Sequence, residues 1–166
     1  MADELINVLF LCTGNSARSI LAEGLLHHYG RGRFQAFSAG SHPTGRVNPF
    51  ALELLEQEHM ALPQARSKNW DEFAQVGAPP MHIVITVCDN AAGEICPIWP
   101  GHPQTAHWGV SDPAGVEGSD ADKRQAFRRA FATLRARIRG LIALPPEVLT
   151  SPQLKRELHA LGQHDA

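Results

Sequence analysis

A short apolar strand that passes straight into a polar loop and then a helix constrains this chain more than any other feature. Residues 8 to 11 are apolar, Cys12 follows them at once, and helical spacing begins after Arg18. In such a unit the N–H groups of the loop point inward, and the helix N-terminus adds partial positive charge. The stretch therefore predicts an oxyanion site formed by Thr13, Gly14, Asn15, Ser16, Ala17, Arg18 and Ser19.

Cys12 and Arg18, at the two ends of this loop, give the predicted site its chemistry. The planar guanidinium of an arginine binds two oxygens of an oxyanion at once. The same positive field stabilises a thiolate, so we expect a lowered pKa for Cys12. A buried cysteine is often only a small apolar residue. The position directly after a strand, with Gly14 and Asn15 in the loop, instead favours a nucleophile that faces a bound oxyanion.

The rest of the chain alternates predicted strands with predicted helices. Besides residues 6–11, apolar runs indicate strands at 33–37, 82–87 and 105–108. Asn48 and Pro49 begin a helix that extends to Gln57. A long helix starts near Ser119 or Asp120, and short helices are expected at 70–73 and after Ser151-Pro152. This alternation predicts an α/β fold with a four-stranded parallel sheet flanked by helices.

The two longer predicted helices each have an apolar side that identifies a buried face. In the helix at 49–57 we expect Leu52 and Leu55 to be buried, with Val47 placed to contact Leu52 across the helix start. In the long helix, apolar residues recur at steps of four and three. Its other faces carry six arginines, for which we expect a solvated surface: Arg124, Arg128, Arg129, Arg135, Arg137 and Arg139.

Three chemically active side chains come directly after predicted strands. These are Cys12, Cys88 and Asp112, and they are far apart in the sequence. The carboxyl ends of parallel strands share one edge of the sheet, so the three side chains are expected to converge there. A long irregular segment after Cys88 holds the third cysteine, Cys96, and its length indicates a functional loop.

Length, charge and cysteine content narrow the class of protein. The 166 residues, 43% of them apolar, suit one domain over residues 1–166, in which residues 144–166 form a C-terminal extension with a short helix. The net charge of −2 does not suit a nucleic-acid-binding protein, and no apolar run is long enough to span a membrane. The N-terminus lacks the basic start of a signal peptide. An odd number of dispersed cysteines fits a cytoplasmic protein with working thiols.

Several blocks of this sequence resemble a known family. The run CTGNSARS at residues 12–19, placed after an apolar strand, and Asp112-Pro113 late in the chain resemble the low-molecular-weight protein tyrosine phosphatase fold. The sequence is most similar to the thioredoxin-coupled arsenate reductases built on that fold. The matching blocks are residues 8–23, 38–40, 47–49, 84–88, 96–98 and 107–115, in family order.

The resemblance implies a catalytic cycle with named roles. Cys12 would attack arsenate held by the loop and Arg18, and Asp112 would protonate the leaving oxygen. Ser19 would hydrogen-bond the Cys12 thiolate. Cys88 would attack the adduct and release arsenite, and Cys96 would then take over the disulfide from Cys88. Two thiols that become a disulfide supply the two electrons that arsenate reduction needs.

The same resemblance implies no bound cofactor and a monomer. The electron donor would be an external thiol, with thioredoxin favoured and glutathione with glutaredoxin as the alternative. Some reductases of this type hold potassium near the loop through an Asn, a Glu, a Ser and an Asp. Asn15, Glu23 and Ser38 match the first three, but Lys68 stands near the fourth. We therefore expect the Lys68 ammonium to pair with Glu23, and we expect no potassium dependence.

The sequence departs from the family pattern at a few positions. Seven residues separate Cys88 from Cys96, where family members often have six. Ala17 stands where phosphatases carry a second cysteine in the loop. The acidic pair before Pro113 is reduced to Ser111-Asp112, which leaves Asp112 as the acid.

Two other functions compete with a reductase. A phosphatase would use the same loop and Asp112 to hydrolyse phosphate monoesters through a Cys12 phosphoenzyme. It would not need Cys88 and Cys96, and it would usually carry tyrosines where Ala114 and Gly115 follow Pro113. A structural zinc site is the second rival, but its candidate ligands lack the short paired spacing of zinc modules, so no metal is expected. Those ligands would be Cys88, Cys96, His102 and His107.

Overall fold

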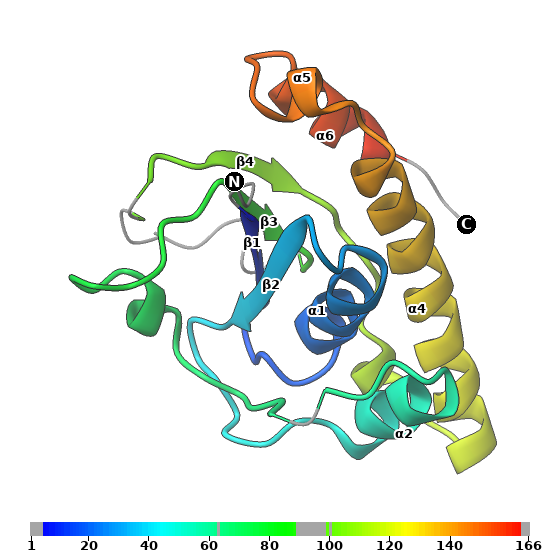
Figure 1. Cartoon of the computed structure of the whole chain (residues 1–166). Coiled ribbons are helices and arrows are strands. Elements are labelled where there is room, and N and C mark those ends of the chain that lie inside the picture. Colours follow the sequence, from blue (N-terminus) through cyan, green and yellow to red (C-terminus); the bar gives the residue numbers. More distant parts are fainter. Residues whose placement is uncertain (1–4, 63, 89–98, 100, 164–166) are drawn as a thin grey trace.

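The computed structural model describes residues 5–62, 64–88, 99 and 101–163, and four parallel strands form its centre. The strands are β1 (Ile6–Leu11), β2 (Phe34–Ala39), β3 (Ile83–Thr86) and β4 (Gln104–His107). Their order in the sheet is β2-β1-β3-β4 (Figure 1). Leu11 pairs with Ala39 on one side and with Thr86 on the other, so the carboxyl ends of the strands lie at one edge. The α/β fold with a four-stranded parallel sheet is confirmed.

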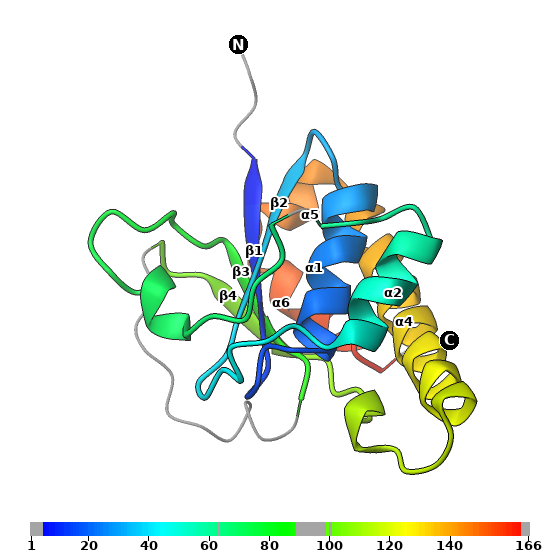
Figure 2. The same ribbon diagram turned by 90° about the horizontal axis from the view of Figure 1, so that it is seen from below.

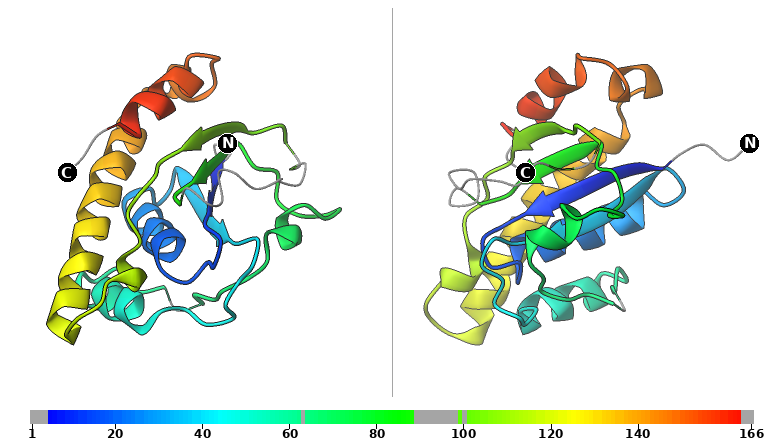
Figure 3. Two further views of the ribbon diagram at one scale, coloured as in Figure 1. Left: turned by 180° about the vertical axis from the view of Figure 1, so that it is seen from behind. Right: turned by 90° about the vertical axis from the view of Figure 1, so that its left-hand side faces the viewer.

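The helices gather on one face of this sheet, as Figure 2 shows. They are α1 (Arg18–Tyr29), α2 (Pro49–Gln57), α4 (Asp120–Ile142), α5 (Pro146–Leu149) and α6 (Leu154–Leu161). α1 packs between the sheet and α4, and the long α4 runs along the outside of the domain (Figure 3). The main core lies between strand residues such as Phe10 and Ile85 and helix residues such as Leu25, Phe127 and Leu134.

The opposite face of the sheet is covered by irregular segments and a short 3-10 helix, η1 (Trp70–Phe73). Leu9, Leu11 and Val84 point to this side, because side chains alternate along a strand. They pack against residues supplied by the covering segments, which are Trp70, Phe73, Met81 and Trp99. The sheet therefore has a helix-covered face and a loop-covered face.

Most element boundaries match the local sequence signals. Asn48 caps α2, and Ser119 caps α4 in a reciprocal capping box with Asp122. The second strand lies one residue later at its start and two later at its end than predicted. The short helix α5 was not predicted, because the Pro145-Pro146 pair indicated only the end of α4, whereas a proline is also well placed in a first helical turn.

Two predictions about helix faces are wrong. Leu52 is 41% exposed, because α2 turns Ala51, Leu54 and Leu55 toward the core. Arg137, expected on the solvated surface of the long helix, is only 3% exposed. Both predictions used only the periodicity of apolar residues. Periodicity does not show which other elements pack against each side of a helix.

The C-terminal residues pack onto the sheet. Leu154 and Leu158 of α6 lie in the main core, and the indole Nε1 of Trp108 donates to the carbonyl oxygen of Leu158 at 2.9 Å. Trp108 follows β4 directly, so α6 supports the end of the strand that leads to Asp112. None of the helices in the described ranges is both long and apolar enough to cross a membrane.

Candidate active site

The loop between β1 and α1 is held at the carboxyl edge of the sheet by its neighbours in space. The N–H of His42 donates to the carbonyl oxygen of Thr13 at 2.9 Å, and Thr44 and Ser67 donate to that of Gly14 at 3.0 and 3.1 Å. Gly40 passes so close that a Cβ there would collide with the carbonyl oxygens of Cys12 and Thr13. The loop therefore keeps its shape through contacts to chain segments distant in sequence.

Asn15 is the bent residue of this loop. Its φ of 45° lies in the left-handed region, which asparagine tolerates better than most residues. Its side-chain Nδ2 donates to Ser19 at 2.8 Å and to Ser38 at 3.0 Å, and its Oδ1 accepts from the Lys68 N–H at 2.9 Å. The buried amide fixes this conformation by tying the loop to α1, β2 and the segment before η1.

The N–H groups that follow this bend are available to a ligand. Within the described part of the chain, those of residues 15 to 19 donate to no other protein group. Ala17 precedes α1 without a side-chain cap, so the helix N-terminus also lacks an internal acceptor. Unpaired N–H groups at a helix N-terminus form a site that favours an oxyanion. The structure thus brings together the loop residues predicted for that purpose.

Cys12 and Cys88 meet beneath the loop. A side-chain hydrogen bond joins the two buried thiols. The N–H of Thr13 donates to the sulfur of Cys88 at 3.2 Å, and the Thr13 hydroxyl lies 3.6 Å from the same sulfur. Thr13 thus faces Cys88, a partner that the sequence did not indicate, since 75 positions separate the two residues.

The expectation of a lowered pKa for Cys12 is wrong in this structure. Its hydrogen bond with Cys88 and its burial raise the pKa above the ordinary value. Arg18 and the N–H of Gly14 act in the opposite direction but do not outweigh them. No hydrogen bond joins Ser19 to Cys12 in the described residues, since the described contact of its hydroxyl is with Asn15. The hydrogen bond with Cys88, together with burial, reverses the expected direction of the pKa shift.

Arg18 connects the loop to the segment that carries Asp112. Its Nη1 donates to the carbonyl oxygen of Val110 at 2.9 Å, and its Nη2 lies 3.8 Å from Asp112 Oδ2. Its Nε is buried and has no partner among the described groups. The side chain is 15% exposed, against 48% for Asp112. Arg18 is thus anchored by one nitrogen and has a second N–H free, while Asp112 stands at the open edge.

A buried cation lies behind the loop, as expected for Lys68. Its Nζ lies 3.9 Å from Glu23 Oε1 and donates to the carbonyl oxygen of Arg66 at 2.9 Å. Ser38 donates to the same carboxylate. Burial lowers the pKa of Lys68 and raises that of Glu23, while the charge of each opposes the shift of the other. The pair forms where the sequence placed it, next to Asn15.

Cys96 lies outside the described residues, so its distance from Cys88 is not part of this geometry. The same holds for any zinc set that would include it. Within the described ranges, no three ligating side chains of histidine, cysteine, aspartate or glutamate come together as a metal site. The Nδ1 of His107, one member of that set, lies 2.8 Å from the Thr86 hydroxyl.

A comparison with protein families matches residues 7–159 to the low molecular weight phosphotyrosine protein phosphatases. The chain belongs to this family. Among its curated relatives, an arsenate reductase of Halalkalibacterium halodurans is 36% identical over 132 residues, or 80% of this chain and 91% of that protein. The arsenate reductase of Bacillus subtilis is 34% identical over 122 residues, or 74% of this chain and 84% of that protein.

A solved structure agrees with these sequence relatives. The thioredoxin-dependent arsenate reductase of Corynebacterium glutamicum superimposes with a TM-score of 0.63 and is 27% identical, covering 85% of this chain and 62% of that chain. The resemblance drawn from residues 12–19 and from Asp112-Pro113 is confirmed at the level of the family and of its arsenate-reductase members.

Proposed function

We propose that this protein is an arsenate reductase that uses Cys12, Cys88 and Cys96 in turn. The contact between Cys12 and Cys88 carries the proposal, because phosphate ester hydrolysis does not need a second thiol beside the nucleophile. The arsenate reductases among its relatives support the same reaction. The biological role would be arsenic detoxification.

The first half of the reaction takes place at the loop. Arsenate binds to the N–H groups of residues 15 to 19 and to the free N–H of Arg18. The Cys12 thiolate attacks arsenic and forms the sulfur–arsenic bond. Asp112 gives its proton to the departing oxygen, which leaves as water. The proton of the Cys12 thiol must leave first, and the positive charge of Arg18 favours that loss.

The second half transfers the electrons. Cys88 attacks the sulfur of Cys12, the pair of electrons in the sulfur–arsenic bond stays on arsenic, and arsenite leaves. Two thiols have then become one disulfide, and arsenic has gained the two electrons. The N–H and hydroxyl of Thr13 stabilise negative charge on Cys88 before the attack. Cys96 next attacks Cys88, which frees Cys12 and moves the disulfide onward.

An external thiol closes the cycle. A dithiol protein such as thioredoxin suits a disulfide held by two protein cysteines, and the thioredoxin-dependent structural relative supports this choice over glutathione with glutaredoxin. We propose a monomer in the cytoplasm, where the reducing environment keeps the three thiols available.

The relay is tested by NADPH consumption that depends on arsenate, coupled through thioredoxin and thioredoxin reductase. Wild type should turn over, and Cys96→Ser should release arsenite once and then stop, because the first disulfide is trapped at Cys12 and Cys88. The matched control is His102→Ser, which alters an exposed residue just beyond the same segment. Sustained turnover by Cys96→Ser would show that thioredoxin reduces the first disulfide directly. Hydrolysis of an aryl phosphate without arsenite formation would favour the phosphatase.

Lys68→Met should make the enzyme sensitive to potassium. The substitution leaves Glu23 buried without its cation, which costs about 3 kcal/mol in the free energy of unfolding. Potassium should restore part of the stability and activity of the variant, and sodium at equal ionic strength should restore less. Unfolding by urea and arsenate turnover, each in potassium and in sodium, give the measurement. Wild type that gains activity on adding potassium would contradict the assignment of Lys68 as the resident cation.

A further inference from the structure

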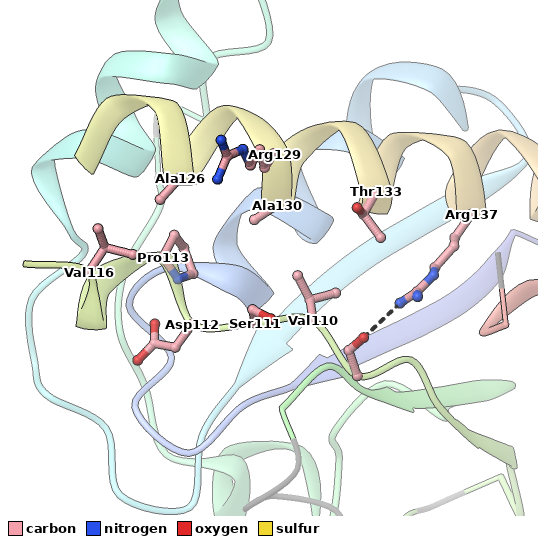
Figure 4. Close-up of a pocket in the computed structure, with 11 residues that line it drawn as sticks. Val110, Ser111, Asp112, Pro113, Val116, Ala126, Arg129, Ala130, Thr133 and Arg137 are labelled. Carbon is pink, nitrogen blue, oxygen red and sulfur yellow. Dashed lines mark hydrogen bonds between the residues drawn. The ribbon is translucent and has the colours of Figure 1, made fainter. Parts of the chain in front are cut away.

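Arg137 of α4 is buried, whereas the other arginines of this helix are half-buried or exposed. Arg137 is 3% exposed, and its Nη1 donates to the carbonyl oxygen of Gly109 at 3.1 Å (Figure 4). Removing a guanidinium from water carries a large free-energy penalty, so an apolar side chain would serve simple packing better. A buried guanidinium at this position therefore indicates that Arg137 makes a polar contact that an apolar side chain could not make.

A contact of Arg137 falls on the segment that carries Asp112. The N–H of Val110 donates to the carbonyl oxygen of Val87 at 3.1 Å, which attaches the segment to the end of β3. Gly109 and Val110 then give their carbonyl oxygens to two arginines on two helices, Arg137 on α4 and Arg18 on α1. Asp112 begins the 3-10 turn η2 (Pro113–Gly115), in which its Oδ1 accepts from the Ala114 N–H at 3.0 Å.

The side of this segment that faces α4 is poorly supported by packing. A cavity of about 320 Å³ lies between the segment and the helix, lined by Val110, Asp112, Pro113, Ala130, Thr133 and Arg137 among others. In Figure 4 the small side chains of Ala126, Ala130 and Thr133 project from α4 above the segment, while Arg137 reaches down to it. The hydrogen bond from Arg137 to Gly109 thus crosses a gap that side chains do not fill.

We propose that Arg137 is a positioning residue for Asp112. Arg137 holds the backbone at Gly109, three residues before Asp112, from the α4 side. Arg18 holds the next residue, Val110, from the side of the oxyanion loop. Without Arg137 the segment is free to move toward the cavity, and the Asp112 carboxyl moves away from the oxyanion that Arg18 binds. This role rests on the proposed function, in which Asp112 is the proton donor.

A double-mutant cycle tests the role. Arg137→Met in the wild-type background should lower kcat/KM for arsenate about 10-fold, the effect of losing one hydrogen bond from a charged donor. In the Asp112→Asn background the same substitution should cost less than about twofold, because the group that it positions is already absent. Arg129→Met is the matched control, since Arg129 lines the same cavity but is exposed, and it should leave both backgrounds unchanged.

The outcomes separate the inference from the proposed function. An equal loss in the two backgrounds would show that Arg137 acts on the fold alone, and would overturn its positioning role. If Asp112→Asn alone left kcat/KM for arsenate unchanged, Asp112 would not be the proton donor. The positioning role of Arg137 would then also be overturned. Should Arg137→Met unfold, Arg137→Lys gives the cycle, because lysine keeps the charge and can reach one carbonyl. In the wild-type background Arg137→Lys should keep a higher kcat/KM than Arg137→Met. In the Asp112→Asn background the two variants should have the same kcat/KM, and this pattern would also support positioning.

Discussion

Replacing Arg18 with lysine should lower kcat/KM for arsenate about 10³-fold while the protein stays folded. Arg18 uses one nitrogen for the carbonyl oxygen of Val110 and keeps its buried Nε free for the oxyanion. Lysine carries a compact ammonium in place of the planar guanidinium, so it reproduces neither contact in this geometry. Losing two charge-assisted hydrogen bonds of about 2 kcal/mol each corresponds to about three powers of ten in rate.

The matched control is Arg128→Lys, the same chemical change at an exposed position of α4, which should leave kcat/KM unchanged. Steady-state arsenate reduction and thermal unfolding, measured on both variants, separate catalysis from stability. Full activity in Arg18→Lys would mean that the backbone N–H groups bind the oxyanion without the guanidinium. It would also mean that the contact with Val110 has no influence on Asp112.

Cys88→Ala should abolish arsenite formation while oxyanion binding is retained. Without Cys88, no thiol among the residues that the structure describes lies in contact with Cys12, so we expect the sulfur–arsenic adduct to lack the thiol that would attack its sulfur. The N–H groups of residues 15 to 19, which we propose bind the oxyanion, have no described contact with Cys88 and should stay in place. Arsenite released in a single turnover, and phosphate binding measured by calorimetry, should therefore respond in opposite ways: the first disappears and the second persists.

The same variant gives a pH signature with a definite sign. Cys88 is the strongest cause of the raised pKa of Cys12, and Arg18 and the Gly14 N–H, which lower it, remain in the variant. The pKa of Cys12 should therefore fall, and its thiolate fraction at neutral pH should rise. Alkylation of Cys12 by iodoacetamide, followed against pH by peptide mass spectrometry, measures this change. Slower alkylation of Cys12 in Cys88→Ala than in wild type at neutral pH would contradict the observed contact.

Features that are determined by residues close together in the sequence were predictable from it. The end of β1 at Leu11, the caps at Asn48 and Ser119, and the loop from Thr13 to Ala17 each follow from local signals. The convergence of Cys12, Cys88 and Asp112 also followed, because parallel strands align their carboxyl ends whatever the details of packing. Local chemistry and a general rule of topology were sufficient for these.

Features that depend on distant partners were not predictable in this way. The sequence predicted that Cys12 and Cys88 converge, but not the direct contact that raises the pKa of Cys12. It also did not predict that Arg137 is buried with its Nη1 on the carbonyl oxygen of Gly109. No spacing rule links such pairs, since their distance in space is set by the packed sheet and helices. Lys68 was the exception, because the family pattern already indicated a cation beside Glu23.

The unequal covering of the sheet has a consequence for how the domain opens. Helices hold their hydrogen bonds cooperatively, whereas irregular segments separate from a core one piece at a time. The face with Trp70 and Trp99 should therefore open locally at a lower free energy than the face beneath α1 and α4. Cys88 belongs to the core under the helices, whereas Trp99 belongs to the core under the loops. A reductant that approaches from the loop side meets the half of the domain that yields first.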